Sequence, residues 1–295
     1  LYTDLIIGDY NREWLVNPKF KYHNFSASAG ISHQLNENNS VLFNYALSSR
    51  APNPSELFSD GLHHSAARIE LGDLRMPQER SNRVSASYNF ENDKTAILIE
   101  LFYNQIYNFM YIEPEGTEQT IRGAFPVWVY NKTNASLFGV DVNWRQKITK
   151  QIDFKHQSSF IRGKDLVNDR HLIDIPAAST LNSIGYQNKK WQHFNASLES
   201  NFVFKQHLFP NNNFDVFIPS TNNTVLLDVS STPSSYHLLK FNTDVTFKLS
   251  EKSKVTVGFT ITNILNTKYR AYLNRLRYFA DDLGRNYVLQ LKFNY

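Results

Sequence analysis

Apolar and polar residues alternate with a period of two along much of the chain. Between Leu239 and Leu249 the residues at odd positions are apolar with the single exception of Thr243, and the residues at even positions are all polar. A helix that began at Leu239 would need apolar residues at positions 242, 243 and 246, where the chain has Asn242, Thr243 and Thr246. The pattern therefore predicts a β-strand with one apolar and one polar face.

The same alternation recurs in many strand-sized segments. It is present in residues 25–31, 41–48, 84–90, 138–145, 194–204, 255–262 and 287–295. One residue departs from it, because His156 falls within the apolar series formed by Ile152, Phe154 and Phe160. A β-bulge or a position near a membrane interface would explain this departure. The longest apolar runs, such as residues 125–130, are also of strand length and too short for a membrane-spanning helix.

The connections between these segments are of two kinds, which alternate along the chain. Short polar connections occur at 36–40, 91–94, 147–151, 188–190 and 251–254, and long connections occur at 50–78, 110–123, 163–176, 206–234 and 266–284. Hairpin connections make neighbouring strands antiparallel. Short turns at one end and long loops at the other are typical of a transmembrane β-barrel. We therefore predict an all-β, antiparallel, up-and-down transmembrane β-barrel, with about eleven strands in this chain.

Composition favours a membrane barrel over a soluble β-sandwich. Only 41% of the residues are hydrophobic, yet 14% are aromatic. The polar faces of the predicted strands are rich in Ser, Thr, Asn and Gln, as expected of a wall around a water-filled lumen. Aromatic residues gather near the predicted strand ends, as in the girdles at lipid interfaces: Trp144, Trp191, Tyr236, Tyr287 and Tyr295.

Charge and cysteine content exclude several other classes of protein. The chain has 31 Lys and Arg against 27 Asp and Glu, a net charge of +4, and no dense basic run. This balance is too mild for a nucleic-acid partner. The absence of cysteine excludes disulfides, iron–sulfur clusters, thiolate zinc sites and cysteine nucleophiles. No nucleophile-elbow, zinc-protease or P-loop motif occurs, so we expect neither an enzyme nor a resident cofactor.

Several motifs, in order along the chain, resemble those of TonB-dependent outer-membrane receptors. The segment 49–61 (SRAPNPSELFSDG) resembles the R-A-P-x-x-x-E-L-F element of that family. Similar likenesses are found at 70–82 (ELGDLRMPQERSN), 130–141 (YNKTNASLFGVD) and 261–269 (ITNILNTKY). The segment 284–295 (GRNYVLQLKFNY) resembles the family's last strand, with its terminal aromatic residue. Each motif is loose by itself, and their order and spacing together make the resemblance specific.

This resemblance implies a barrel of 22 strands whose lumen is closed by an N-terminal plug. Residues 1–295 then correspond to the C-terminal portion of the barrel, about half of its strands, without the plug domain. The resemblance also implies a place in the lipid of the bacterial outer membrane. The expected partners are the TonB system, through the missing plug, and the outer-membrane assembly machinery, through the C-terminal strand. Because a half-barrel leaves two unpaired edges in lipid, we expect the chain to act only as part of a longer receptor.

The long connection 50–78 carries a candidate metal site. It contains Asp60, His63, His64 and Glu70, and imidazole and carboxylate groups are the ligands that Zn²⁺ takes in tetrahedral sets. The context also resembles receptors of the zinc-uptake branch, which carry histidines in a loop at this point. The alternative interpretation is structural, because adjacent histidines on an extended segment point in opposite directions.

Cationic and aromatic residues form a second candidate site. Arg68, Arg275 and Arg277 fall in long connections, where they would attract an anionic ferric chelate. Tyr272 and Tyr278, in the last long connection, would stack on a siderophore, a porphyrin or a cobalamin. The alternatives are solvated loop charges for the arginines and loop packing for the tyrosines.

The resemblance implies TonB-dependent uptake of a scarce nutrient. His63 and His64 make zinc, or another transition metal, the first hypothesis for the cargo, and a ferric siderophore or haem the second. The zinc or iron chelate would then be the cargo and not a cofactor. A hydrolase built on an outer-membrane barrel is the alternative from a different class of protein.

Overall fold

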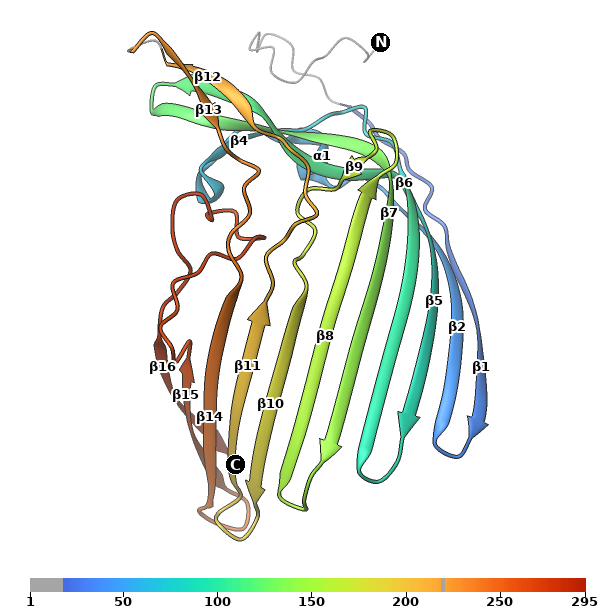
Figure 1. The fold of residues 1–295 in the computed structure, drawn as a ribbon, viewed down its shortest axis with the longest axis vertical. Coiled ribbons are helices and arrows are strands. Elements are labelled where there is room, and N and C mark those ends of the chain that lie inside the picture. The colour runs from blue at the N-terminus through green and yellow to red at the C-terminus, as the bar shows by residue number, and fades with distance from the viewer. Residues whose placement is uncertain (1–17, 219–220) are drawn as a thin grey trace.

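The described part of the chain forms one long antiparallel sheet. The computed structural model describes residues 18–218 and 221–295. Eleven strands within these residues follow one another along the sheet (Figure 1). They are β1 (Ser26–Asn36), β2 (Asn39–Arg50), β5 (Glu79–Glu91), β6 (Thr95–Thr120), β7 (Gly123–Lys147), β8 (Ile152–Asp165), β10 (Ser179–Asn188), β11 (Phe194–Val203), β14 (Tyr236–Lys248), β15 (Lys254–Thr262) and β16 (Asn286–Asn294). The predicted all-β antiparallel architecture and the predicted number of strands are confirmed.

The remaining elements lie in the long connections. They are the helix α1 (Pro54–Phe58), the single 3₁₀ turn η1 (His64–Ala66) and the short strands β3 (Asp60–His63), β4 (Arg68–Leu71), β9 (Arg170–His171), β12 (Phe214–Ile218) and β13 (Asn223–Leu227). Strands β12 and β13 form a separate two-stranded sheet. No helix among the described residues is long and apolar enough to cross a membrane.

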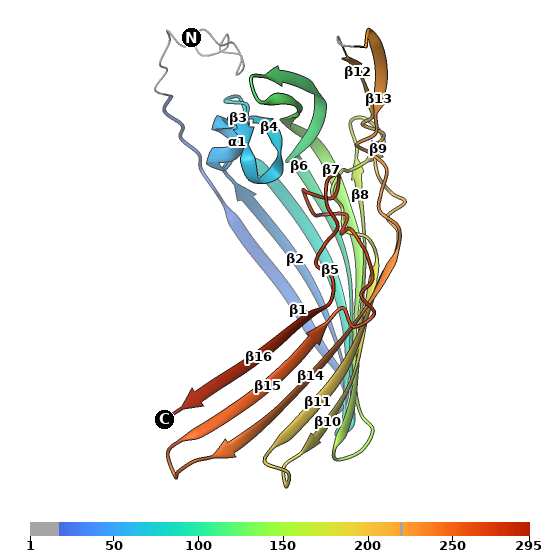
Figure 2. The same cartoon turned by 90° about the vertical axis from the view of Figure 1, so that its left-hand side faces the viewer.

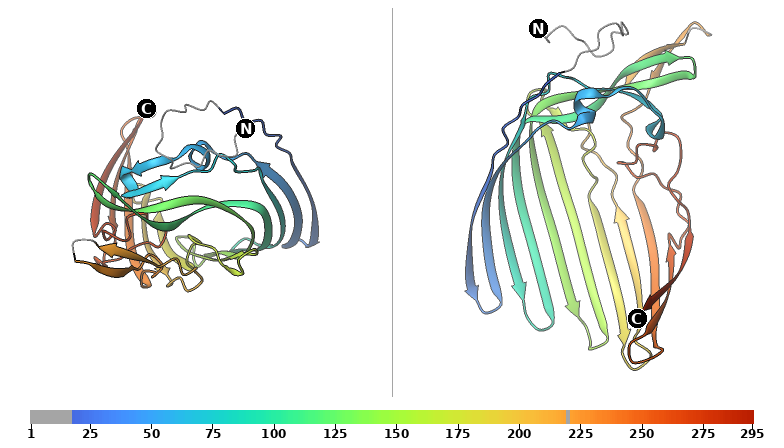
Figure 3. Two further views of the ribbon diagram at one scale, coloured as in Figure 1. Left: turned by 90° about the horizontal axis from the view of Figure 1, so that it is seen from above. Right: turned by 180° about the vertical axis from the view of Figure 1, so that it is seen from behind.

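The sheet is curved like a trough, with β1 and β16 at its two edges (Figures 2 and 3). Each of these edge strands pairs with one neighbour within the described residues. The short turns lie at one end of the strands and the long connections lie at the other (Figure 1). This arrangement is the one that the alternation of short and long connections predicts.

One predicted loop is wrong. The sequence indicated a long loop at 110–123, but β6 runs on to Thr120 and β7 begins at Gly123, so the two strands are joined by a tight turn. Two irregularities of register, between Ile106 and Phe109 and between Pro114 and Gly116, absorb local departures from the strand pattern. The hairpin therefore continues beyond its neighbours as a paired ribbon, which Figure 1 shows above the end of β8.

Strand pairing sorts the side chains onto two faces. One row across six strands is apolar and consists of Ile31, Phe43, Ala86, Leu101, Val140 and Phe160. An adjacent row on the opposite face contains Glu100, Asp141 and Ser159, which line a hollow of about 510 Å³. The polar rows thus line the concave side and the apolar rows cover the other, as in a barrel with a wet lumen.

His156 remains in an unbroken strand. The pairing of β8 with β7 and with β10 continues through His156 without a register shift, so the bulge, one of the two explanations considered for this residue, is wrong. Its Nδ1 atom lies 2.8 Å from the Oδ1 atom of Asn182 on β10. The polar ring is therefore satisfied by its cross-strand partner.

Gly139 makes room for an aromatic ring on the concave face. A Cβ atom at this position would overlap the ring of Phe102 on the neighbouring strand. That ring in turn carries the guanidinium of Arg83, whose Cζ atom lies 4.0 Å from the ring centroid. The ring thus occupies the space beside Gly139 and contacts the cation of Arg83.

We expect Gly139→Ala to lower the free energy of unfolding by about 1–3 kcal/mol, because the Phe102 ring must move. Thermal unfolding of the purified full-length protein in detergent measures this effect. Gly258→Ala is the matched control, because a Cβ atom there would meet its nearest neighbour at an ordinary 3.7 Å. Equal losses in the two variants would contradict the proposed role of the ring.

Candidate functional site

The connection 51–78 is fastened to the rim of the barrel by Arg50. The guanidinium of Arg50 lies 3.0 Å from Glu56 and 3.0 Å from Glu79, so it joins α1 to the start of β5. Asn53 caps α1 and forms a capping box with Glu56. The R-A-P-N-P-S-E motif therefore encodes the anchor from which the rest of this connection extends.

The connection then folds back over the concave side of the sheet (Figures 2 and 3). Strands β3 and β4 form a small hairpin, and β4 pairs in parallel with β7, where Glu70 lies opposite Trp128. Gly72 permits this return, because a Cβ atom there would lie 2.7 Å from the backbone carbon of Leu57. The extended β6–β7 hairpin is thus the support on which Arg68 and Glu70 are placed.

The predicted zinc ligands are not brought together. The carboxylate of Glu70 is buried and lies 2.7 Å from Arg68 and 3.7 Å from Arg275. The Nδ1 atom of His63 lies 3.4 Å from the hydroxyl of Ser65. In residues 18–218 and 221–295, no group of three His, Cys, Asp or Glu side chains is placed to hold a metal ion. Because two arginines engage Glu70, this carboxylate is committed to ion pairs.

Arg277 is buried inside the last long connection, 266–284. Only 6% of the residue is exposed, and its guanidinium lies 4.6 Å from the ring centroids of both Tyr272 and Tyr278. It donates to the backbone carbonyl of Tyr272 and, over 2.6 Å, to the hydroxyl of Tyr278. Its ion pair is with Asp174, at 3.4 Å. These contacts shape the loop and leave little of Arg277 accessible to a ligand.

Tyr278 links the last connection to the one before it. Its hydroxyl donates to the backbone carbonyl of Val229 over 3.0 Å. Burial raises the pKa of Tyr278 to about 12, although the neighbouring Arg277 lowers it. The phenol therefore remains a protonated donor throughout the neutral range.

The connections 51–78, 206–234 and 266–284, together with the β6–β7 hairpin, enclose a pocket of about 610 Å³ at the loop end of the barrel. One side comes from η1, β4 and β7, a second from the β12–β13 hairpin, and a third from the last connection. Its apolar lining includes Ala66, Pro126, Trp128, Val216, Val225, Leu227 and Phe279. A volume of this size and an apolar lining with a few polar groups are typical of small-molecule sites.

The polar groups of the pocket include three of the five residues that the sequence singled out as ligand-binding. Arg68, Arg275 and Tyr278 line the pocket, whereas Tyr272 and Arg277 lie behind Tyr278 as its support. Arg68 is buried over the ring of Trp128, with its Cζ atom 4.3 Å from the centroid. The side chain of Arg275 is 55% exposed and is the accessible cation of the set.

Sequence analysis missed two parts of the pocket. Trp128 lies in the apolar run 125–130, which was recognised only as strand-sized, and the β12–β13 hairpin lies inside the predicted connection 206–234. The available signal for Trp128 was an aromatic residue in an apolar run that directly follows the predicted connection 110–123. No local pattern indicates that β12 lies against β6, because that proximity arises from the fold.

Comparison with known proteins identifies the family. The family described as TonB dependent receptor-like, beta-barrel matches residues 5–264, and the chain belongs to it. Its members are β-barrels of the bacterial outer membrane, which confirms the predicted family and location. Comparison with curated proteins by sequence gives no match.

Solved structures share the fold at low sequence identity. The copper transporter OprC has a TM-score of 0.70 and 13% identity over 92% of this chain and 39% of its own. The ferric enterobactin receptor PfeA from Pseudomonas aeruginosa has a TM-score of 0.62 and 14% identity over 91% of this chain and 40% of its own. The siderophore receptor PirA from Acinetobacter baumannii has a TM-score of 0.61 and 15% identity over 92% and 41%. The chain therefore spans about two fifths of the length of these receptors.

We expect Tyr278→Phe to lower the thermal midpoint at pH 8, because the variant loses a hydrogen bond to Val229 worth about 1 kcal/mol. A phenol with a raised pKa contributes stability that is complete below its usual pKa of 10.0 and is lost as the pH rises through about 12. The difference in thermal midpoint between parent and variant should therefore decrease as the pH rises from 10 to about 12. Tyr295→Phe, at a residue that is 95% exposed, is the control. A gap that stays constant up to pH 12 would contradict the assignment.

Proposed function

We propose that this chain is the C-terminal portion of the barrel of a receptor that takes up a metal chelate in a TonB-dependent manner. The observation that carries the proposal is the pocket between Trp128, Arg275 and Tyr278, which combines an apolar wall with two arginines, the exposed Arg275 and the buried Arg68, against one lining carboxylate, Asp228. Such a lining suits a flat, partly apolar ligand with an anionic edge, such as a ferric siderophore or haem.

The same geometry favours a chelate over a free zinc ion. A bare divalent cation needs several side-chain ligands around one point, and the described residues offer no such group. Glu70, the carboxylate proposed as a ligand from the sequence, is already paired with Arg68 and Arg275. An exposed arginine beside an apolar wall attracts the anionic ligand shell of a chelate, whereas it repels a cation.

Two of the three structural neighbours are named for this class of cargo, and the third is named for a metal. By their names, PfeA is a receptor for ferric enterobactin, PirA is a siderophore receptor and OprC is a copper transporter. The family assignment also favours uptake over the alternative of a barrel hydrolase.

Closure of the barrel requires further strands. β1 and β16 run in the same direction, since they are the first and the last of eleven strands that alternate in direction. A second copy of the chain would therefore meet these edges with parallel strands, whereas antiparallel closure needs an odd number of additional strands. We propose that the rest of the same receptor supplies these strands and the plug through which TonB acts. The edge strand β16 is then also the one read by the assembly machinery.

Ligand binding to the full-length receptor tests the proposal. We expect a ferric tris-catecholate complex or haemin to bind, and Arg275→Gln to weaken binding about tenfold through loss of a charge-assisted contact. Titration calorimetry gives both affinities. The variant His63→Ala/His64→Ala is the control and should bind the chelate as the parent does. Zinc binding that this control loses, with no binding of either chelate to the parent, would instead make zinc the cargo.

A further inference from the structure

The β12–β13 hairpin forms one wall of the pocket without being part of the barrel sheet. Val216, Val225 and Leu227 line the pocket from this hairpin. Within the described residues, β12 and β13 pair only with each other. No strand pairing joins the hairpin to the barrel, although β12 lies beside β6, so its position depends on side-chain contacts, including those at its base.

The base of the hairpin is cross-linked by hydrogen bonds. The backbone amide of Asn212 donates to the hydroxyl of Ser230 over 2.6 Å. The side-chain oxygen of Asn213 accepts from the amides of Val229 and Ser230, both at 3.0 Å. The segment that enters the hairpin and the segment that leaves it are therefore held as one unit.

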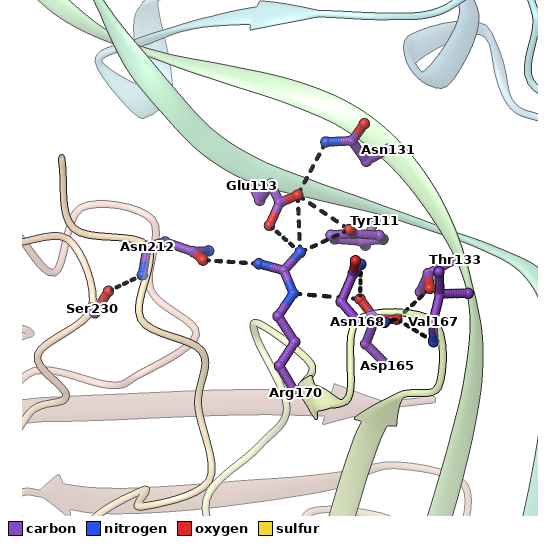
Figure 4. Close-up of polar contacts among 10 residues, drawn as sticks. All are labelled: Tyr111, Glu113, Asn131, Thr133, Asp165, Val167, Asn168, Arg170, Asn212 and Ser230. Atoms are coloured by element: carbon purple, nitrogen blue, oxygen red, sulfur yellow. Dashed lines mark hydrogen bonds and ion pairs between the residues drawn. The ribbon is translucent and has the colours of Figure 1, made fainter.

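Two side chains from other parts of the fold hold this unit. On one side, Tyr278 donates to the carbonyl of Val229, as described above. On the other side, the Nη1 atom of Arg170 donates to the Oδ1 atom of Asn212 over 3.3 Å (Figure 4). The base of the hairpin thus lies between the last connection and the connection that follows β8.

Arg170 is itself fixed to the barrel and to the extended β6–β7 hairpin. Its Nη2 atom lies 2.8 Å from the carboxylate of Glu113 and donates to the hydroxyl of Tyr111 over 3.1 Å. Its Nε atom lies 3.4 Å from Asp165 at the end of β8. Figure 4 shows these groups gathered around a single guanidinium. The planar fork of arginine allows one side chain to meet acceptors from several elements.

One of these acceptors, Asp165, is itself held by several hydrogen bonds. Asp165 is 1% exposed, and it accepts from the hydroxyl of Thr133 and from the backbone amides of Val167 and Asn168. These hydrogen bonds hold the carboxylate of Asp165 in place at the end of β8.

We propose that Arg170 is a positioning residue of the pocket, which fixes the β12–β13 hairpin as a pocket wall through Asn212. The inference about the hairpin rests on the geometry alone, and its consequence for affinity rests on the proposed function. Arg170 does not line the pocket, so it acts on a ligand only through the hairpin.

Asn212 offers a sharp test, because only one end of its amide is used. Its Oδ1 atom accepts from Arg170, whereas its Nδ2 atom is buried with no hydrogen-bond partner in the described part of the chain. Asn212→Asp therefore keeps the acceptor and gives up no bonded donor. Asn212→Leu has a similar size and removes the acceptor.

The position of the hairpin can be measured by spin labelling, because the chain has no cysteine. Ile121→Cys, at the tip of the β6–β7 hairpin, and Leu226→Cys, on β13, place labels at residues that are 104% and 60% exposed. Pulsed electron paramagnetic resonance of the full-length receptor gives the distribution of distances between them. We expect a narrow distribution in the labelled parent and in Asn212→Asp, and a broad one in Arg170→Gln and Asn212→Leu. The control is Arg83→Gln, which breaks the Arg83–Glu100 ion pair of 2.9 Å inside the barrel and should leave the distribution narrow.

Affinity for a ferric tris-catecholate complex is the second measurement. Arg170→Gln and Asn212→Leu should weaken binding about tenfold through loss of preorganisation, and Asn212→Asp should bind as the parent does. Narrow distributions in both Arg170→Gln and Asn212→Leu would overturn the inference. Broad distributions in these two variants would support the inference even if neither the parent nor any variant binds the complex. Such a lack of binding would reject the chelate proposal alone.

Discussion

Backbone N–H and C=O groups inside a bilayer have no water to bond, and each must find a partner within the protein. In this chain neighbouring strands supply the partners, along an antiparallel path from β1 to β16. Because successive side chains of a strand point to opposite faces, the same pairing sorts the side chains. Ile31 beside Phe43 belongs to a row that meets lipid, and Glu100 beside Asp141 belongs to a row that meets the lumen.

Beyond the barrel rim, water can bond the backbone groups, so strand pairing is no longer required. Side-chain contacts then determine how the connections are arranged. The β6–β7 hairpin continues as the common support for the connections on the concave side. On it, Trp128 lies under Arg68, and Glu113 holds Arg170. Charged groups appear in buried positions there because each has an opposite charge or several hydrogen bonds. The loops can thus enclose an apolar pocket while their own polar groups remain satisfied.

The candidate site shows where sequence reasoning succeeds and where it stops. Arg68, Arg275 and Tyr278 were singled out for their chemistry and their place in long connections, and all three line the pocket. Arg277 has the same chemistry and lies within two residues of Arg275, yet it is buried between tyrosines. Spacing along an irregular loop does not determine which side chains turn inward, so the two arginines could not be told apart beforehand. Glu70 was assigned to zinc for the same reason, because its ion-pair partners arise from the fold.

Sequence patterns alone were enough to predict the period of the strands, most of the short and long connections, the class of barrel and the family. These properties are local or repetitive, and the requirement that every backbone group in the membrane be paired translates them directly into a sheet. Three features became visible only in the folded chain: β6 and β7 extend past the rim, β4 pairs with β7, and the β12–β13 hairpin forms a pocket wall. These features depend on contacts between segments far apart in the chain, where packing and ion pairing select one arrangement that no local pattern specifies.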